Sequence, residues 1–421
     1  GKYGTRDIKI VTDNGGINLK SGRIYGNAIT ITGANNATGD IKVDTNVNGN
    51  IKIENAGKGD IIVNGNLNSS DSSHYVVIEN QTYDIVANRA SDGEYKVLDV
   101  KRYNRNSQNL NGGILANGKI FGGDIYIQNV GAKGITTTND ITGRNIYITN
   151  DGGSIDLISG KISSLRDIAI SNLSHAAGIN IGADINANSN NKILSSIVYI
   201  ANAGKGDLNI SGDIFAQTDV MITNQLGTLG TTRVTYDDGF VLNMDYSHGP
   251  SVNLDENTGI NLSGNINANR LVTVQNAGKK GITMDSNVRA GEFVENESGE
   301  IANQGVISVI NDNGNINITG GTINGSKVTI TNANKGGSLT TKANINASDL
   351  VLIENAGKGD MTVDGNITSN KILLENQTYD IVTNIDGVCT NYLEMSRLDA
   401  PSTNTNGGLI ASGNILGETV Y

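Results

Sequence analysis

The eight residues IENAGKGD occupy positions 53–60 and return unchanged at 353–360. A close copy, IANAGKGD, lies at 200–207, and the looser copies VQNAGKKG and IQNVGAKG begin at Val274 and Ile127. A segment that recurs within one chain marks a repeated structural unit. The period of that repeat therefore decides the fold.

The asparagine of this segment gives the period. Equivalent asparagines follow strand-like apolar runs at intervals of 20 to 23 residues in three parts of the chain. One unit, NAGKGDMTVDGNITSNKILLEN (355–376), holds three short strand-like runs separated by turns. Three such strands cannot form a stable sheet alone, so each unit is expected to pair with its neighbours. The asparagines are Asn14, Asn35 and Asn55; Asn129, Asn150 and Asn172; and Asn311, Asn332, Asn355 and Asn376.

These repeats predict an all-β fold, a parallel β-helix (solenoid) with coils of about 21 residues and a core of stacked Ile, Val and Leu. The composition agrees, because the 421 residues include 54 Gly, 2 Pro and no Trp, and aromatic residues make up only 4%. The net charge of −11 argues against nucleic acid as a partner. No apolar run approaches about 18 residues, so we expect no membrane insertion. The only cysteine, Cys389, excludes an intrachain disulfide.

A longer period of about 150 residues overlies the first and is marked by breaks after Asn80, Asn224 and Asn376. Each break contains Asp-Gly followed by apolar residues, which is typical of a hairpin. We therefore expect one continuous β-helix over 1–421, from which three hairpin or loop insertions protrude. The chain begins and ends within the repeat pattern, so we expect it to be a segment of a longer protein. The insertions are expected at about 83–110, 226–257 and 382–405.

We interpret the repeated segment itself as a corner of the coil. Glycines at Gly57 and Gly59 would supply the positive φ that a tight corner needs, and Asn55 tolerates left-handed backbone geometry. Asparagines stacked in successive coils would also form an amide ladder. The same structural roles are predicted for Asn202, Gly204, Gly206, Asn355, Gly357 and Gly359.

Three functional interpretations compete with the corner. A phosphate loop would need Gly-Lys followed by Ser or Thr and then a helix, whereas Gly-Asp and a strand follow here. Lys-Gly-Asp resembles an integrin-type recognition tripeptide. The segments TDNGG from Thr12 and NDNGN from Asn311 offer oxygen ligands for calcium, but without the spacing of a calcium loop.

Signals for catalysis are weak. The three histidines are scattered, and β-helical lyases and hydrolases need clustered acidic residues on one sheet face. One insertion position holds Asp99 and Glu394, but Asn243 occupies it in the middle copy. We therefore predict no enzyme and no catalytic, cofactor-binding or metal-binding residues.

Aromatic and arginine side chains, which usually carry binding energy, gather in the three insertions. We predict that the insertions contact a partner or a neighbouring copy. The alternative is that each hairpin packs on the coils and shields an apolar face. The candidate contact residues are Tyr95, Arg102, Tyr103, Tyr236, Phe240, Tyr246, Tyr392 and Arg397.

Coils such as GNINITGGTINGSKVTITNANKGG (314–337), GINLSGNINANRLVTVQNAGKKG (259–281) and GRNIYITNDGGSIDLISGKI (143–162) resemble the shaft repeats of filamentous-haemagglutinin-like adhesins. The Asn-, Ile- and Lys-rich style is also similar to that of leukotoxin-related filamentous adhesins. The resemblance covers most of the chain outside the insertions. The amino-terminal secretion domain of the family is not visible in this sequence.

This resemblance implies a right-handed winding and a fibre exported by two-partner secretion to the bacterial outer surface or the medium. Its implied partners are a receptor or matrix of a host or neighbouring cell. Copies are also expected to associate end to end or side by side. The alternative functions are a β-helical carbohydrate-active enzyme and a phage-type tail fibre. An upstream transporter-recognition domain would favour the adhesin, whereas a trimerisation domain would favour the tail fibre.

Overall fold

A computed structural model gives the architecture, and every regular element in its described residues is a β-strand. The chain divides into two compact units, which are described separately: unit 1 contains residues 1–184 and 230–245, and unit 2 contains 185–229 and 246–421. At several positions in the hairpins the structure describes the backbone but not the side chain. The described residues are 6–421 without 70–73, 93–94, 106, 174, 189–195, 227, 237–238, 248–255, 292–293, 296–300, 303–304 and 387–391.

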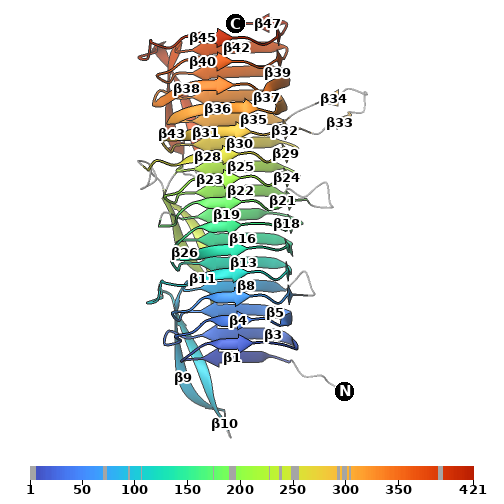
Figure 1. Cartoon of the computed structure of the whole chain (residues 1–421), viewed down its shortest axis with the longest axis vertical. Helices are drawn as coiled ribbons and strands as arrows, with labels where there is room; N and C mark the ends of the chain where they lie inside the picture. Colours follow the sequence, from blue (N-terminus) through green and yellow to red (C-terminus); the bar gives the residue numbers. More distant parts are fainter. Residues whose placement is uncertain are drawn as a thin grey trace. The chain divides into compact units, whose positions relative to one another are not determined.

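The coils of unit 1 are built from two sets of parallel strands (Figure 1). The first set belongs to a sheet of 14 strands: β2 (Ile17–Leu19), β4 (Ile41–Val43), β6 (Ile61–Val63), β11 (Gly113–Ala116), β14 (Gly134–Thr137), β17 (Ile155–Leu157) and β20 (Ile179–Ile181). The second set belongs to a sheet of 25 strands: β1 (Ile8–Thr12), β3 (Arg23–Gly33), β5 (Asn46–Asn55), β7 (Leu67–Asn68), β8 (Tyr75–Asn80), β12 (Ile120–Phe121), β13 (Asp124–Asn129), β15 (Ile141–Gly143), β16 (Asn145–Asn150), β18 (Lys161–Ser164) and β19 (Ile168–Asn172).

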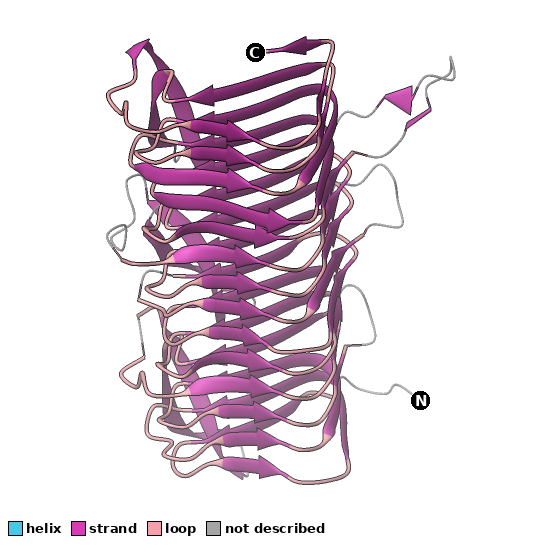
Figure 2. Cartoon of the chain, turned by 45° about the horizontal axis from the view of Figure 1, so that its top comes forward, coloured by secondary structure: helices cyan, strands magenta, loops and turns pink. Residues whose placement is uncertain are grey.

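Unit 2 is built in the same way, and Figure 2 shows the parallel strands of its coils lying side by side. Its strands in the smaller sheet are β23 (Leu208–Ile210), β28 (Gly259–Leu262), β31 (Gly281–Asp285), β36 (Gly314–Gly320), β38 (Gly336–Thr341), β40 (Met361–Val363) and β45 (Leu409–Ala411). Those in the larger sheet are β21 (Asp184–Ala187), whose first residue lies in unit 1, β22 (Ile197–Asn202), β24 (Ile214–Ala216), β25 (Asp219–Asn224), β29 (Ile266–Ala268), β30 (Leu271–Asn276), β32 (Val288–Ala290), β35 (Val306–Asn311), β37 (Thr322–Asn332), β39 (Asn344–Asn355), β41 (Ile367–Thr368), β42 (Lys371–Asn376), β46 (Ile415–Leu416) and β47 (Thr419–Val420).

Equivalent residues pair from coil to coil, which confirms the predicted parallel β-helix. Ile127 pairs with Ile78 on one side and Ile148 on the other, and all three side chains are fully buried. Alternation along each strand sends one set of residues into this stack and the other set outward. The predicted core residues Ile353 and Val363 are 0% and 1% exposed. The fold therefore rests on stacked aliphatic side chains and on backbone ladders between coils.

Three antiparallel hairpins interrupt the coils at the predicted places. Hairpin 1 is β9 (Asp84–Asp92) with β10 (Tyr95–Tyr103), hairpin 2 is β26 (Thr228–Tyr236) with β27 (Gly239–Ser247), and hairpin 3 is β43 (Tyr379–Asp386) with β44 (Tyr392–Pro401). Hairpin 3 begins at Tyr379, ahead of the predicted bound at 382. The sequence reasoning missed a fourth, short antiparallel pair, β33 (Val294–Glu295) with β34 (Ile301–Ala302).

Hairpins 1 and 3 run back over coils that precede them in the sequence, rather than standing straight out from the coils. Hairpin 1 follows β8 but contacts β1, and it extends past β1 in Figure 1. In hairpin 3 the amide of Leu393 donates to Oε1 of Gln275 in β30, at 3.0 Å. The apolar inner faces explain this course, because Ile85 packs in a cluster with Ala34 and Ala56. Burial of these side chains stabilises the docked hairpins.

Candidate functional site

From Asn55 onward the corner asparagines form the predicted amide ladder. Asn35 and Asn14 were wrongly included, because Gly33 and Thr12 occupy the paired positions in the two preceding coils. Each Nδ2 donates to Oδ1 of the next asparagine, and nearly all of these side chains are buried. Buried amides that satisfy one another in this way hold successive coils in register. In unit 1 the distances are 2.9 to 3.1 Å through Asn55, Asn80, Asn129, Asn150 and Asn172. In unit 2 they are 2.7 to 2.9 Å through Asn202, Asn224, Asn276, Asn311, Asn332, Asn355 and Asn376.

The reason predicted for the corner glycines is wrong. Gly57 and Gly59 are not among the residues with positive φ, and neither are the corresponding glycines of the other two copies. A Cβ on Gly57 would lie 2.5 Å from the carbonyl oxygen of Ala37, and one on Gly59 would lie 2.4 Å from a carbonyl oxygen of the preceding coil. Glycine is needed because the backbones of neighbouring coils approach too closely for any side chain.

The Lys-Gly-Asp copies are also explained by the corner. The lysines Lys58, Lys205 and Lys358 are exposed, as expected. The aspartates are not free carboxylates, because each accepts a backbone hydrogen bond from the next coil. The donors are Gly113 to Asp60 at 3.0 Å, Gly259 to Asp207 at 3.0 Å and Gly408 to Asp360 at 2.7 Å. This bonding favours the structural interpretation over a recognition tripeptide.

A buried cluster of charged side chains lies beneath hairpin 1. Glu54 and Glu79 occupy paired positions on β5 and β8 and are 1% and 0% exposed. Arg102 of hairpin 1 donates from Nε to Glu54 Oε2 at 2.9 Å. Lys52 Nζ lies 3.6 Å from Glu54 Oε2 and 3.7 Å from Glu79 Oε2. The hydroxyl of Tyr83 lies 2.9 Å from Glu79 Oε2 and also contacts Glu54. Hairpin 1 is thus held to its coils by a buried network of charges.

The pKa values of Glu54 and Glu79 are shifted in opposite directions. Burial alone would raise the pKa of Glu54, but Lys52 and Arg102 outweigh it and hold that pKa at about 2. Burial raises the pKa of Glu79 to about 7, with the neighbouring Glu54 charge adding to the effect and Lys52 opposing it. Burial and both carboxylates raise the pKa of Tyr83 well above its usual value. Below pH 7 the protonated Glu79 can donate to the Tyr83 hydroxyl, which donates to ionised Glu54.

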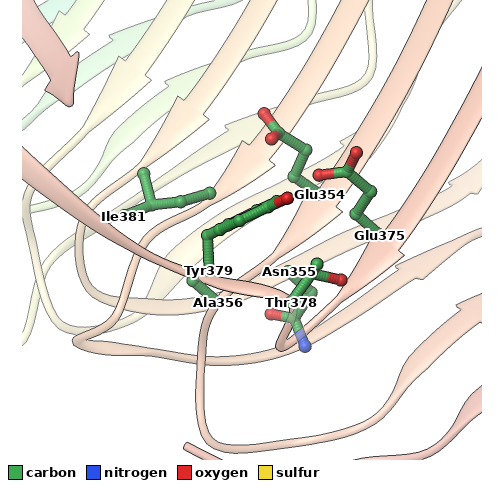
Figure 3. A pocket seen from close by; sticks show the side chains of 7 residues that line it. All are labelled: Glu354, Asn355, Ala356, Glu375, Thr378, Tyr379 and Ile381. Carbon is green, nitrogen blue, oxygen red and sulfur yellow. The ribbon is translucent and has the colours of Figure 1, made fainter. Parts of the chain in front are cut away.

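Unit 2 contains the equivalent cluster beside hairpin 3. Arg397 pairs with Glu354 and lies 3.5 Å from Glu375 Oε2. Figure 3 shows Glu354 and Glu375 on neighbouring strands, with the Tyr379 hydroxyl directed toward them. Leucine replaces lysine at position 352, and burial raises the pKa of Glu354 even though Arg397 opposes the shift. The missing lysine explains why Glu354 and Glu54 shift in opposite directions.

Paired carboxylates and a tyrosine are groups that serve acid–base chemistry, so the room around them decides their role. The cavity at Glu354, Glu375 and Tyr379 has a volume of about 10 Å³. That volume admits about one water molecule. Glu354 also lines a groove of about 460 Å³, but Glu375 and Tyr379 are not among the residues that line it. The equivalent groups of unit 1 are sealed from solvent. The contacts of these groups attach the hairpins to the coils.

The structure describes the side chains of only some of the predicted contact residues. Tyr103 is half-buried, with the Lys101 ammonium 5.1 Å and the Arg105 guanidinium 5.3 Å from its ring centre. The side chains of five others lie outside the described residues, although their strands β10, β26, β27 and β44 are described. They are Tyr95, Tyr236, Phe240, Tyr246 and Tyr392. Arg102 and Arg397 face the coils, so the structure favours packing for these two.

A glutamine at the root of each hairpin was missed by the sequence reasoning. Gln81, Gln225 and Gln377 are the described non-glycine residues with positive φ, at 59°, 61° and 53°. Gln81 donates from Nε2 to the carbonyl of Gly57 at 2.7 Å and accepts from the amide of Gly112 at 2.9 Å. It therefore ties the coil before the insertion to the coil after it. The repeated hexapeptide ENQTYD at 79–84 and 375–380 was the available signal.

Two further observations bear on function. Within the described part of the chain, no group of three or more His, Cys, Asp or Glu side chains is placed to hold a metal ion. Nor does that part contain a helix long and apolar enough to cross a membrane. The chain matches no protein-family model, no curated protein and no solved structure. The class defined by the fold and the site is a parallel β-helix with hairpins docked through buried charges.

Proposed function

We propose that this chain is a shaft segment of an adhesive fibre at the bacterial outer surface or in the medium, of the filamentous-haemagglutinin-like kind. The proposal makes it a structural and binding protein, not an enzyme. Its partners would be a receptor or matrix on host or neighbouring cells, and further copies of itself.

The observation that carries the proposal is that the buried polar side chains bond to neighbouring coils and to the hairpins. Buried amides at the corners bond to the next coil, and the buried carboxyls hold the hairpins. Outward positions of the smaller sheet carry short polar side chains, as exposed Asn180, Asn261 and Thr283 illustrate. Such a surface suits a long, soluble repeat protein better than a catalytic site. The outer faces of the hairpins, with exposed Asp99 and Lys101, remain for contact with partners.

Adhesion and turnover are both measurable on the 421-residue chain. Beads coated with the chain are expected to adhere to epithelial cells or extracellular matrix more than beads coated with albumin. Reversing charge on the outer face of hairpin 1, with Asp99→Lys and Lys101→Glu, is expected to reduce that adhesion. Incubation with acidic polysaccharides is expected to release no new reducing ends. Polysaccharide cleavage, or adhesion equal to albumin, would contradict the proposal.

A further inference from the structure

Asn313 and Gly314 follow strand β35 in unit 2 and contact each other through the asparagine side chain. The amide nitrogen of Gly314 donates to Oδ1 of Asn313 at 3.0 Å. The contact places this nitrogen beside Cγ, the carbon to which Oδ1 is bonded. Asn313 is only half-buried, and Gly314 has a φ of 78°. Two groups that can react with each other react faster when the fold holds them together, and these two can close a succinimide ring.

Other Asn-Gly pairs of the chain have both groups engaged elsewhere. At 64–65 and 117–118 the glycine amides donate to carbonyl oxygens of the preceding coil, at 2.9 and 3.1 Å. The Oδ1 atoms of Asn64 and Asn117 each accept from a side chain of the following coil at 2.9 Å. Ring closure at these pairs would therefore break bonds between coils, whereas at Asn313 the two reacting groups already contact each other.

The surroundings of Asn313 hold the coils and hairpin 3 together. The preceding Asp312 is 5% exposed, and its Oδ2 accepts from Nζ of Lys335 at 3.0 Å. Its Oδ1 accepts from the hydroxyl of Thr383 in hairpin 3. The carbonyl oxygens of Asn313 and Gly314 accept from two asparagines of the amide ladder, at 3.4 and 3.1 Å. A chemical change at Asn313 would therefore reach both the ladder and the hairpin.

We propose that Asn313 is a site of spontaneous deamidation that loosens hairpin 3 as the chain ages. The nitrogen of Gly314 attacks Cγ of Asn313, and the bond from Cγ to Nδ2 breaks. Nδ2 leaves as ammonia and takes the proton of the Gly314 amide. Water then opens the succinimide at either carbonyl carbon, which gives aspartate or isoaspartate. The inference goes beyond the adhesive role and does not depend on it.

Both products change this corner of the coil. A carboxylate at position 313 adds a negative charge next to Asp312, and like charges repel each other. Isoaspartate also lengthens the main chain by one methylene group between Cα of residue 313 and the nitrogen of Gly314. That change displaces the carbonyl groups to which the ladder asparagines donate. The Asp312 contact with hairpin 3 is expected to weaken in both cases.

Peptide mass spectrometry of the 421-residue chain after incubation at mildly alkaline pH measures deamidation at each site. Asn313 is expected to deamidate at least about tenfold faster than Asn64 and Asn117. In urea the three rates are expected to converge, because unfolding removes the contact. At Asn139 the amide of Asp140 makes the same contact at 2.9 Å, but the side chain of Asp140 crowds the attacking nitrogen, so slow deamidation is expected.

Hydrogen exchange of the hairpin 3 amides measures the consequence. Exchange is expected to be at least about fivefold faster in the aged chain and in Asn313→Asp than in the fresh chain. The matched control, Asn324→Asp, adds the same charge at another Asn-Gly pair of unit 2, where Asn324 accepts from Asn346 at 3.0 Å. It is expected to leave exchange of hairpin 3 unchanged.

Two results would overturn the inference. The first is deamidation of Asn64, Asn117 or Asn139 in the folded chain as fast as that of Asn313. The second is exchange of hairpin 3 that is the same in the aged and the fresh chain, or that rises equally in Asn313→Asp and Asn324→Asp. Neither result bears on adhesion, which the bead assay measures on the fresh chain.

Discussion

The attachment of hairpin 1 is expected to depend on pH through Glu79. This carboxyl is buried among Lys52, Glu54, Tyr83 and Arg102, and its pKa is about 7 instead of 4.5. Opening the hairpin returns Glu79 to water and to an ordinary pKa. The contribution to docking is therefore fully present below pH 4.5 and is lost as the pH rises through 7. The difference, 7 − 4.5 = 2.5 units, corresponds to about 3 kcal/mol of docking free energy.

Glu54 sets the limit on the acid side. Its pKa is held at about 2, so its contribution is present above about pH 4.5 and is lost as the pH falls toward 2. The docked hairpin should consequently be most stable near pH 4.5. Above that pH the opening equilibrium should shift toward the open form by roughly three-hundredfold before it levels off past pH 7.

Hydrogen exchange of the hairpin 1 amides measures this opening directly. Rates from pH 4.5 to 8 are divided by the intrinsic exchange rates, and amides of the coil core such as Ile148 serve as the internal reference. Glu79→Gln keeps the size of the side chain and removes its titration, so its corrected profile is expected to be flat. A flat profile in the unaltered chain, or the same slope with glutamine at 79, would refute the reasoning.

The remaining predictions concern the coils and are checked by urea or thermal unfolding. Ile353→Ala should cost roughly 2–4 kcal/mol, because the side chain is fully buried, and the exposed Lys358→Ala should cost under about 0.5. Asn129→Ala interrupts the ladder and leaves buried partners unbonded, at roughly 1–3 kcal/mol per lost partner. Gly57→Ala forces a carbonyl contact and should destabilise the chain, whereas Gly408→Ala, whose Cβ meets nothing closer than 3.6 Å, should have little effect.

The fold was predictable because its signal is periodic. A coil of about 21 residues repeats the same apolar and turn positions many times, so chance agreement is averaged away. The amide ladder was predictable for the same reason, since Asn55 and the asparagines that follow it recur at one position of the coil; the spacing alone misplaced Asn14 and Asn35, where Thr12 and Gly33 hold that position. Residue type and spacing were sufficient to place these residues on the corner.

The role of the corner glycines was not predictable from type and spacing. Glycine permits both positive φ and close backbone approach, and the sequence does not distinguish the two. Only the distance from Gly57 to the carbonyl of the preceding coil decides between them. Gln81 was missed for a related reason, because glutamine rarely adopts positive φ and the backbone rule points to glycine or asparagine instead.

The sequence contains a pattern that corresponds to the charge cluster, and the reasoning about catalytic residues did not use it. Aligning the hairpins places Arg102, Tyr246 and Arg397 at one position, and aligning the corners places Glu54, Ala201 and Glu354 at another. Arginine occurs where the corner carries glutamate, and tyrosine occurs where it carries alanine. A buried arginine without its carboxylate would be costly, so the two positions have to change together. The three copies within this chain therefore relate the residue in each hairpin to the residue at its corner. The structure explains the two copies that have arginine, because Arg102 pairs with Glu54 and Arg397 pairs with Glu354.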